Sequence, residues 1–255
     1  MNYIISATTD VGIRKKTNQD SLSVKIINTN QGRMAFAILC DGMGGLQKGE
    51  VASAAVIHAF NQWVTEELPS LCNGPIQDHV IREQWCEIIT SMNEKIKNYG
   101  NVNHVQLGTT AVVMLITEKR YYILNVGDSR AYEIWIEITQ LTKDQTFVER
   151  QVSLGNMTRE QAEQDSRKNI LLQCVGASPE VYPEMFFGDT KKDAVYMLCS
   201  DGFRHEITPE EIYAGFNPGV LLSKENMQNN AIHLININKQ RQENDNISVA
   251  LIRTF

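Results

Sequence analysis

Four aspartates stand where an apolar run of the sequence ends or begins. Three follow such a run and lie beside glycine or serine, in AFAILCDG, YILNVGDS and YMLCSDG, and the fourth precedes ISVALI; they are Asp41, Asp128, Asp201 and Asp245. Bringing several carboxylates together at the ends of buried strands is unfavourable, because their repulsion and their loss of water must be offset by positive charge. A divalent cation is the natural counter-charge.

Carboxylate oxygens are the ligands of hard cations, so this pattern predicts Mg²⁺, Mn²⁺ or Ca²⁺. A site with more than one such ion can polarise a phosphoryl group and supply a hydroxide. Gly42, directly after Asp41, would let a backbone carbonyl and a substrate approach closely. The alternative is that each Asp-Gly pair only forms a turn, which is common for one pair taken alone. Four together favour the metal site.

Strand and helix patterns surround these aspartates. The runs SLSVKII and MAFAILC, and the runs TTAVVMLI and YYILNV, are each separated by a polar turn and predict two antiparallel hairpins. Between the hairpins, apolar residues at three- and four-residue spacing predict one helix over 48–68 and a second over about 76–99. Trp63 and Trp85 follow this spacing and should lie in the core. Further strands are expected at AYEIWIEITQL, AVYMLCS and ISVALIRT.

Residues 147–170 are polar and contain the helix-start signature TREQ, which begins at Thr158. They predict an inserted helical flap. A similar signature, TPEE, begins at Thr208. No repeat, low-complexity tract or linker divides the chain, so we expect a single domain that mixes α and β structure over residues 1–255.

The composition argues against several classes of protein. A hydrophobic content of 42% and a charged content of 21% are ordinary for a globular domain. The formal net charge of −6 argues against nucleic-acid binding, which needs clustered Lys and Arg. No apolar run approaches the ~20 residues that cross a bilayer, and no basic segment precedes an apolar one at the N-terminus. We therefore expect no membrane association, a cytoplasmic location and a monomer.

The five cysteines are odd in number and lack CxxC spacing. Reduced, buried thiols are therefore expected, rather than a disulfide framework or a zinc site.

Seven stretches follow one another along nearly the whole chain: GIRKKTNQD (12–20), CDGMGGLQKGEVAS (40–53), LGTTAV (107–112), VGDSRAY (126–132), LTKDQT (141–146), LCSDGF (198–203) and DNISVALI (245–252). Each alone is a weak signal. In this order and spacing they resemble the motifs of the PPM (PP2C-type) metal-dependent protein serine/threonine phosphatases, of the compact bacterial type.

The resemblance implies an α+β fold: a central sandwich of two antiparallel β-sheets flanked by pairs of helices (α-β-β-α), with a helical flap and a metal cluster at one end. It implies that Asp41 bridges two ions, that Gly42 lends its carbonyl, and that Asp201 and Asp245 hold the first ion. The ions would be Mn²⁺ or Mg²⁺.

Two further metal residues are implied. Asp20 would act mainly through bound water, and Asp128 would help to bind a third ion together with Asp201. The implied catalytic residues are then Asp41, Asp201, Asp245 and Arg14.

The implied reaction is hydrolysis of phosphoserine and phosphothreonine by direct attack of a metal-bridging hydroxide on phosphorus, without a phosphoenzyme. The partners would be phosphorylated proteins and a cognate Ser/Thr kinase, whose action the enzyme would reverse. One alternative is a pseudophosphatase or phosphoprotein-binding module, which the intact aspartates disfavour. Another is a hydrolase of small phosphoesters or nucleotides, but the sequence has neither a GxxxxGK[ST] loop nor a GxGxxG stretch opening a helix.

The sequence departs from the family pattern near its first motif. The family usually has an arginine shortly before NQD or NED, at the position of Lys15, and Arg14 lies one residue earlier. Either Arg14 grips the phosphate with its planar fork, which we favour, or Lys15 serves as a point charge. Met43 stands where some relatives have a histidine proposed to protonate the leaving group, so a metal-bound water is the expected donor. His58 and His233 should be partly buried structural residues.

The flap is a second departure. QDSRKNILLQCVG stands where relatives tend to have a histidine-proline pair and then an arginine before the asparagine. Because this segment should shape access to the site, the difference concerns substrate preference more than activity.

Overall fold

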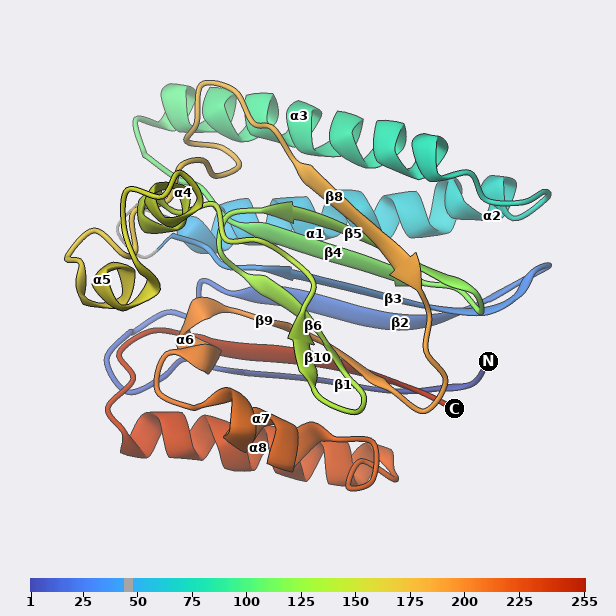
Figure 1. Ribbon diagram of the computed structural model, residues 1–255. Helices are drawn as coiled ribbons and strands as arrows, with labels where there is room; N and C mark the ends of the chain where they lie inside the picture. The colour runs from blue at the N-terminus through green and yellow to red at the C-terminus, as the bar shows by residue number, and fades with distance from the viewer. Residues whose placement is uncertain (44–47) are drawn as a thin grey trace.

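Two antiparallel β-sheets pack face to face at the centre of the molecule (Figure 1). The computed structural model describes residues 1–43 and 48–255. The first sheet has the order β2 (Ser21–Thr29), β3 (Gly32–Cys40), β4 (Ala111–Ile116), β5 (Arg120–Val126) and β8 (Glu184–Asp189). The second has the order β1 (Tyr3–Asp10), β10 (Ile247–Thr254), β9 (Val195–Cys199), β6 (Arg130–Ile134) and β7 (Ile138–Gln140).

Helices cover the outer face of each sheet. The first sheet is covered by α1 (Gly49–Glu66), α2 (Leu68–Leu71) and α3 (Asp78–Asn103), and the second by α7 (Pro209–Phe216) and α8 (Lys224–Gln240) (Figure 1). Three short helices, α4 (Phe147–Ser153), α5 (Arg159–Gln164) and α6 (Asp201–Arg204), lie at the end of the sandwich opposite the two termini. This is the α-β-β-α arrangement that the family resemblance predicted.

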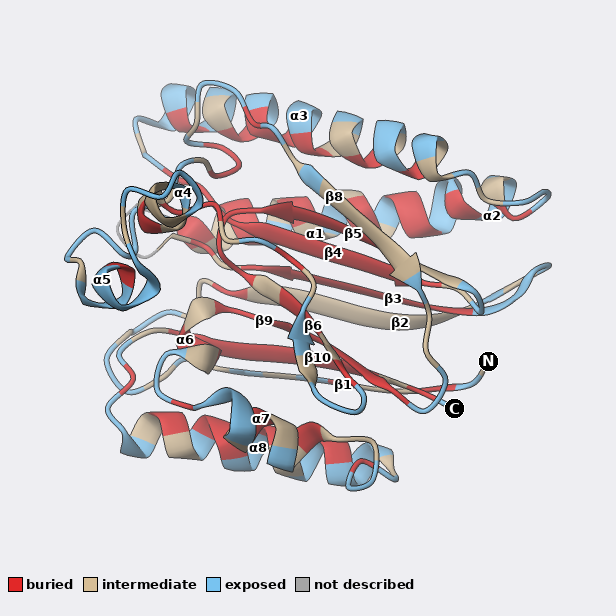
Figure 2. Cartoon of the chain, viewed as in Figure 1, coloured by how far each residue is buried: buried red, intermediate tan, exposed pale blue. Residues whose placement is uncertain are grey.

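The strand β3 shows why its sequence is apolar almost throughout. Its even-numbered residues from Met34 to Cys40 pack under α1 and α3, and its odd-numbered residues from Ala35 to Leu39 face the second sheet. Each fully buried side chain of this size contributes about 1.5–3 kcal/mol to folding. The central strands are therefore buried on both faces (Figure 2), and their ends are firmly placed.

Most of the predicted elements form. Both hairpins are present as β2–β3 and β4–β5, and Trp63 and Trp85 lie in the core with ring centroids 5.4 Å apart. The first predicted helix is α1, whereas the second runs on to Asn103, past the predicted end near residue 99. The predicted flap contains α4 and α5, and Thr158 caps α5 with the complete capping box.

The structure also has elements that the sequence analysis did not anticipate. The strand β8 adds to the edge of the first sheet, and α8 covers the second. The run AYEIWIEITQL forms two strands, because the chain turns back where the N–H of Trp135 donates to the carbonyl of Glu137 at 3.0 Å. Both strands belong to the second sheet, so the chain crosses between sheets after β5.

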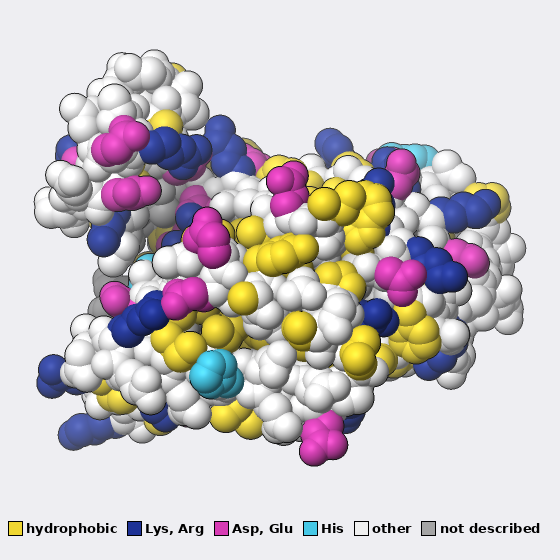
Figure 3. Space-filling model, turned by 60° about the horizontal axis from the view of Figure 1, so that its bottom comes forward, with side chains coloured by type: hydrophobic (Ala, Val, Ile, Leu, Met, Phe, Trp, Pro, Cys, Tyr) yellow, Lys and Arg dark blue, Asp and Glu magenta, His cyan; other side chains and the backbone are white. Residues whose placement is uncertain are grey.

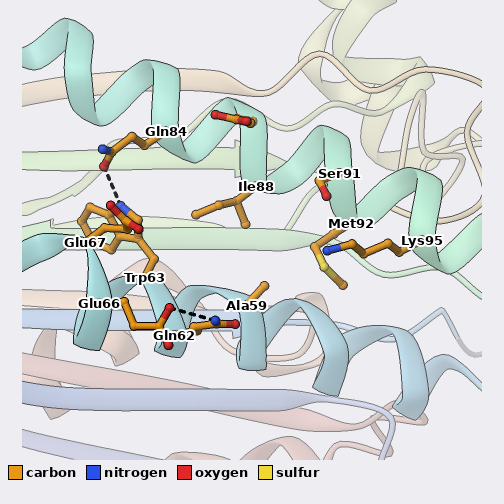
Figure 4. A pocket seen from close by; sticks show the side chains of 11 residues that line it. Ala59, Gln62, Trp63, Glu66, Glu67, Gln84, Ile88, Ser91, Met92 and Lys95 are labelled. Atoms are coloured by element: carbon orange, nitrogen blue, oxygen red, sulfur yellow. Dashed lines mark hydrogen bonds between the residues drawn. The ribbon is translucent and has the colours of Figure 1, made fainter.

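One face of the molecule and one groove lie away from the predicted site residues. On the face drawn in Figure 3, acidic and basic side chains are interspersed. A groove of about 410 Å³ lies between α1 and α3, where Nε1 of Trp63 donates to Oε1 of Gln84 at 2.7 Å (Figure 4), but none of the predicted site residues lines it. Among the described residues, no helix is both long and apolar enough to span a membrane.

Candidate metal centre

Antiparallel pairing carries the predicted aspartates to one end of the sandwich. Because β3 and β5 both pair with β4, they run in the same direction, so Asp41 and Asp128 follow their strands at the same edge. The strand β2 runs opposite to β3, which places Asp20, just before β2, at that edge too. In the second sheet, β9 ends and β10 begins at a common edge, with Asp201 after the first and Asp245 before the second.

The backbone of Asp41 is held by the LGTTAV motif. Its N–H donates to the hydroxyl of Thr110 at 3.0 Å, and its carbonyl accepts from Thr110 N and from the hydroxyl of Thr109, both at 2.9 Å. The hydroxyl of Thr110 also lies 2.7 Å from that of Ser129 in the VGDSR motif. Three motifs thus meet around one carboxylate.

Gly42 lies in a space that admits no side chain. A Cβ added there would lie 2.5 Å from the backbone oxygens of both Gln19 and Gly49. Neighbouring protein backbone therefore excludes a side chain here, and the approach of a substrate to Gly42 stays a prediction. The glycines 44 and 45 of the same motif lie outside the described residues, which exclude 44–47.

Asn246 joins the N-terminal loop to the loop of Asp245. Its Oδ1 accepts from the N–H of Gln19 at 2.9 Å, and its Nδ2 donates to the carbonyls of Val11 at 2.9 Å and Thr17 at 3.3 Å. Gln19 directly precedes Asp20. Of the two adjacent residues, Asp245 belongs to the acidic cluster and Asn246 fixes the N-terminal loop that leads to Asp20.

The LTKDQT motif holds the loop that carries Asp128, through hydrogen bonds to the backbone of Gly127. Gln145 accepts from the N–H of Gly127 through Oε1 at 2.8 Å and donates its own N–H to the carbonyl of Gly127 at 3.0 Å. Arg204, just after the LCSDGF motif, donates to the carbonyl of Asp128 at 3.1 Å, and its guanidinium lies 3.6 Å from the carboxylate. The sequence analysis did not single out this arginine.

The carboxylates repel one another. The pKa of Asp41 lies well above its ordinary value, first because the side chain is removed from water and then because of the charges of Asp20, Asp201, Asp128 and Asp245. Burial, assisted by Asp201 and Asp245, raises the pKa of Asp20 to about 7. Burial and Asp201 likewise raise the pKa of Asp128 to about 7, although Arg204 opposes the shift. The five predicted acids form one electrostatic cluster.

The residues present fit a divalent cation. Both carboxylate oxygens of Asp20 and Oδ1 of Asp201 are buried and have no hydrogen-bond partner within the described part of the chain. Buried acceptors are normally paired, so such oxygens call for a cation. Across residues 1–43 and 48–255, no group of three or more Asp, Glu, His or Cys side chains is placed so as to hold a metal ion. A bound cation would offset the repulsion among the clustered carboxylates.

The two candidate phosphate ligands lie beside the loop of Asp245. Nζ of Lys15 is 3.1 Å from Oδ1 of Asp245. Arg14 is exposed, and its Nε donates to Oδ1 of Asn244 at 3.2 Å. Lys15 is thus paired with a carboxylate of the cluster, while the hydrogen bond of Arg14 within the described part of the chain goes to a neutral amide. The choice of Arg14 stays a prediction.

The flap borders the same end of the sandwich. A cavity of about 330 Å³ is lined by flap residues, among them Arg159 and Lys168, together with Asp128 and Arg204 of the acidic end. The expectation that His58 and His233 are partly buried is wrong: both side chains are exposed, because their positions on α1 and α8 face away from the sheets. All five cysteines are free, and four of them are buried.

Comparisons with known proteins identify the family to which this fold belongs. Residues 13–232 match the family model of protein phosphatase 2C. The protein phosphatase PhpP of Streptococcus pneumoniae is 31% identical over 211 residues, which cover 82% of each chain. The serine/threonine phosphatase stp of Listeria monocytogenes is 29% identical over 248 residues, 96% of this chain and 93% of that one.

Solved structures give the same result. Serine/threonine phosphatase Stp1 from Staphylococcus aureus has a TM-score of 0.84 and 28% identity, covering 100% of this chain and 96% of its own. The catalytic domain of the serine threonine protein phosphatase PstP, solved with two manganese ions, has a TM-score of 0.76 and 25% identity, covering 98% and 97%. The chain belongs to the protein phosphatase 2C family, as its seven motifs predicted.

Proposed function

We propose that this protein is a metal-dependent phosphatase that removes phosphate from phosphoserine and phosphothreonine in proteins. The observation that carries the proposal is a set of buried carboxylate oxygens beside Asp41, both of Asp20 and Oδ1 of Asp201, that have no hydrogen-bond partner among residues 1–43 and 48–255. Family membership and the similarity to named serine/threonine phosphatases support it. In this proposal residues 1–255 form a single phosphatase domain, which is consistent with the pairing of β1 and β10 at the two ends of the chain.

Each acidic residue has a role in this proposal. Asp41 and the carbonyl of Gly42 would hold the two core ions, and Asp201 and Asp245 would be further ligands of the first. Asp20 would act through bound water, and Asp128 would help to hold a third ion with Asp201. We propose Mn²⁺ or Mg²⁺, since all the donors are oxygens. The manganese in the PstP structure supports this choice.

The bound ions would activate water and stabilise charge on the phosphoryl oxygens. The residues of this chain position the metal ligands and bind the phosphate. Thr109 and Thr110 keep Asp41 in place, and the packing around Gly42 keeps the backbone close to the site. Arg14 is the proposed phosphate ligand, because its guanidinium can bind two oxygens at once. Lys15, paired with Asp245, moderates the charge of the cluster.

The biological setting follows from the same chemistry. Phosphorylated proteins would be the substrates, and a Ser/Thr kinase would be the enzyme opposed. We propose that the protein works in the cytoplasm as a monomer. The names of the relatives, as protein phosphatases, support the choice of phosphoproteins over small phosphoesters.

Turnover of a phosphothreonine peptide and of an aryl phosphate tests the proposal. With Mn²⁺ we expect both to be hydrolysed, with no turnover after chelation. Asp201→Asn should lower kcat on the order of 10²-fold or more, because a charge that stabilises the site is lost. Asp193→Asn is the matched control, since Asp193 is exposed and Asn accepts its left-handed φ of 54°.

Two outcomes would contradict the proposal. Peptide binding without turnover at any metal concentration would support the binding-module alternative. Faster hydrolysis of nucleoside monophosphates than of the phosphopeptide would support a small-molecule phosphatase.

A further inference from the structure

Glu243 is a buried carboxylate, only 6% exposed, that lies two residues before Asp245. Its Oε1 accepts two backbone hydrogen bonds, from Asn244 at 2.6 Å and from Asp245 at 2.8 Å. Its Oε2 lies 3.3 Å from Nδ1 of His205. Both oxygens are therefore engaged, and the carboxylate fixes the backbone that presents Asp245.

His205 connects Glu243 to Asp201, the aspartate that follows β9. It directly follows α6 as the C-cap, four positions after Asp201, and its Nε2 lies 3.6 Å from Oδ2 of Asp201. The other oxygen of Asp201, Oδ1, is the buried one without a partner among the described residues. The imidazole thus lies beside one oxygen of Asp201 and leaves the other available to an ion.

Hydrogen bonds of Asn238 to the backbone also connect the segment of His205 with that of Glu243. Asn238, on α8, donates from Nδ2 to the carbonyl of Phe203 at 2.9 Å, and its own carbonyl accepts from the N–H of Glu243 at 3.0 Å. Between them, Gln242 has a φ of 69°, a conformation that residues with a side chain rarely adopt. Such a turn persists only where its surroundings require it, and here it turns Glu243 into the interior.

We propose that Glu243 and His205 are positioning residues for the metal centre: Glu243 fixes the loop of Asp245 and orients His205, which in turn holds Asp201. The proposal rests on the proposed function of the acidic cluster. Partners of this kind orient metal ligands, and their loss commonly weakens metal affinity about 10–100-fold. The family motifs end at Phe203 and begin again at Asp245, so neither residue was singled out by the sequence analysis.

The alternative is that the pair only links two parts of the fold. Its removal would then lower stability and leave Mn²⁺ binding unchanged. The chain offers a control for that case, because Glu211 and Arg241 form an exposed ion pair at 2.6 Å, and Glu211 also caps α7. Glu211→Ala perturbs the same layer of the protein without touching the acidic cluster.

Mn²⁺ binding to the metal-free protein, measured by titration calorimetry, tests the proposal. We expect the dissociation constant to rise about 10–100-fold in His205→Ala and Glu243→Ala. Glu243→Gln should have a smaller effect, because its amide oxygen can still accept the two backbone hydrogen bonds. Glu211→Ala should bind Mn²⁺ as the wild type does. His205→Gln replaces His205→Ala if the alanine variant does not fold.

Kinetics provide the second measurement. At saturating Mn²⁺ the variants should keep the wild-type KM for phosphopeptide, while the Mn²⁺ concentration for half-maximal rate rises with the dissociation constant. Dissociation constants within twofold of the wild type in the folded Glu243 and His205 variants would overturn the proposal. A wild-type protein that binds Mn²⁺ but hydrolyses nothing would overturn the proposed function, and the comparison of affinities would still decide the roles of Glu243 and His205.

Discussion

Arg130 donates two parallel hydrogen bonds to Asp144, one of 2.8 Å from Nε to Oδ1 and one of 2.6 Å from Nη2 to Oδ2. Arg130 lies two residues after Asp128, and Asp144 directly precedes Gln145, which holds the backbone of Gly127. The pair therefore joins the loop of Asp128 to the segment beneath it. Both side chains are largely buried, at 25% and 11% exposure.

Replacing this arginine should show how much the paired geometry contributes. Arg130→Lys keeps the charge but loses one of the two parallel bonds, so we expect a loss of about 1–2 kcal/mol in the free energy of unfolding. Urea denaturation measures it. Arg167→Lys is the control, since Arg167 binds Asp165 with the same two-bond geometry but is half exposed, so its loss should be smaller although it also stacks on Phe147. Equal losses in both variants would contradict the argument.

Gly42→Ala should damage the metal centre. The new Cβ would lie 2.5 Å from two backbone oxygens, so the backbone on at least one side must move. We expect a loss of about 1–3 kcal/mol in stability, typical of overpacking, and at least tenfold weaker Mn²⁺ binding. Thermal unfolding and calorimetry measure the two effects. Gly74→Ala is the control, because a Cβ there meets nothing within 4 Å.

The sequence predicts the parts of this fold that follow from local patterns. The strand β3 is apolar on both faces because it lies between a helical layer and a second sheet, and its end at Cys40 marks the position of Asp41. The glycine after Asp41 meets a steric requirement set by the backbones of Gln19 and Gly49, which the sequence alone did not show. The motifs thus revealed which residues converge, because each is tied to a strand end.

What the sequence could not show are contacts between distant segments. Glu243 and His205 are separated by 38 positions and meet because α8 brings the chain back to the end of α6. The strand β8 pairs with β5 at an edge that no local pattern specifies. His58 and His233 lie on apolar stretches of sequence, yet the rotation of each helix turns them outward. Only the tertiary packing determines these outcomes.

Metal-free protein should become less stable as the pH rises. The pKa of Asp20 and of Asp128 is raised from 3.8 to about 7, chiefly by burial. A carboxylate whose pKa is higher in the folded than in the unfolded state favours folding below its unfolded pKa, and this contribution is lost as the pH rises through about 7. In the presence of a chelator, we therefore expect the Tm to fall between about pH 5 and pH 8.

Asp20→Asn separates this effect from other titrations, because it keeps the shape and removes the charge. Its Tm in chelator should fall less over the same pH range than that of the wild type. Mn²⁺ should raise the wild-type Tm more at the higher pH, since the ligands bind the ion without their protons. A steeper pH dependence in the variant would contradict the assignment.

The flap should have a local stability that depends on its cap. Thr158 accepts from the N–H of Gln161, whose side chain accepts from the N–H of Thr158. Thr158→Ala should destabilise α5 by about 1 kcal/mol, which is roughly a fivefold increase in amide exchange over 159–164. Hydrogen exchange measures it. Thr208→Ala, which removes the same cap from α7 over the second sheet, should leave exchange in α5 unchanged.

Arg14 and Lys15 should differ in what they contribute. Lys15 is paired with Asp245 at 3.1 Å, so Lys15→Ala should mainly change the Mn²⁺ concentration that half-maximal activity requires. Arg14 is exposed beside the same loop and carries a fork that can bind two phosphate oxygens. We expect Arg14→Ala to raise KM for the phosphopeptide about tenfold, which corresponds to about 1.4 kcal/mol of lost binding.

Arg14→Lys distinguishes geometry from charge. If the planar fork matters, the lysine variant should recover less than half of the lost binding free energy, because an ammonium cannot make two parallel bonds. Steady-state kinetics at saturating Mn²⁺ measure all three variants. A larger rise in KM for Lys15→Ala than for Arg14→Ala would show that Lys15 grips the phosphate, and the pairing of Lys15 with Asp245 would then have to open when the substrate binds.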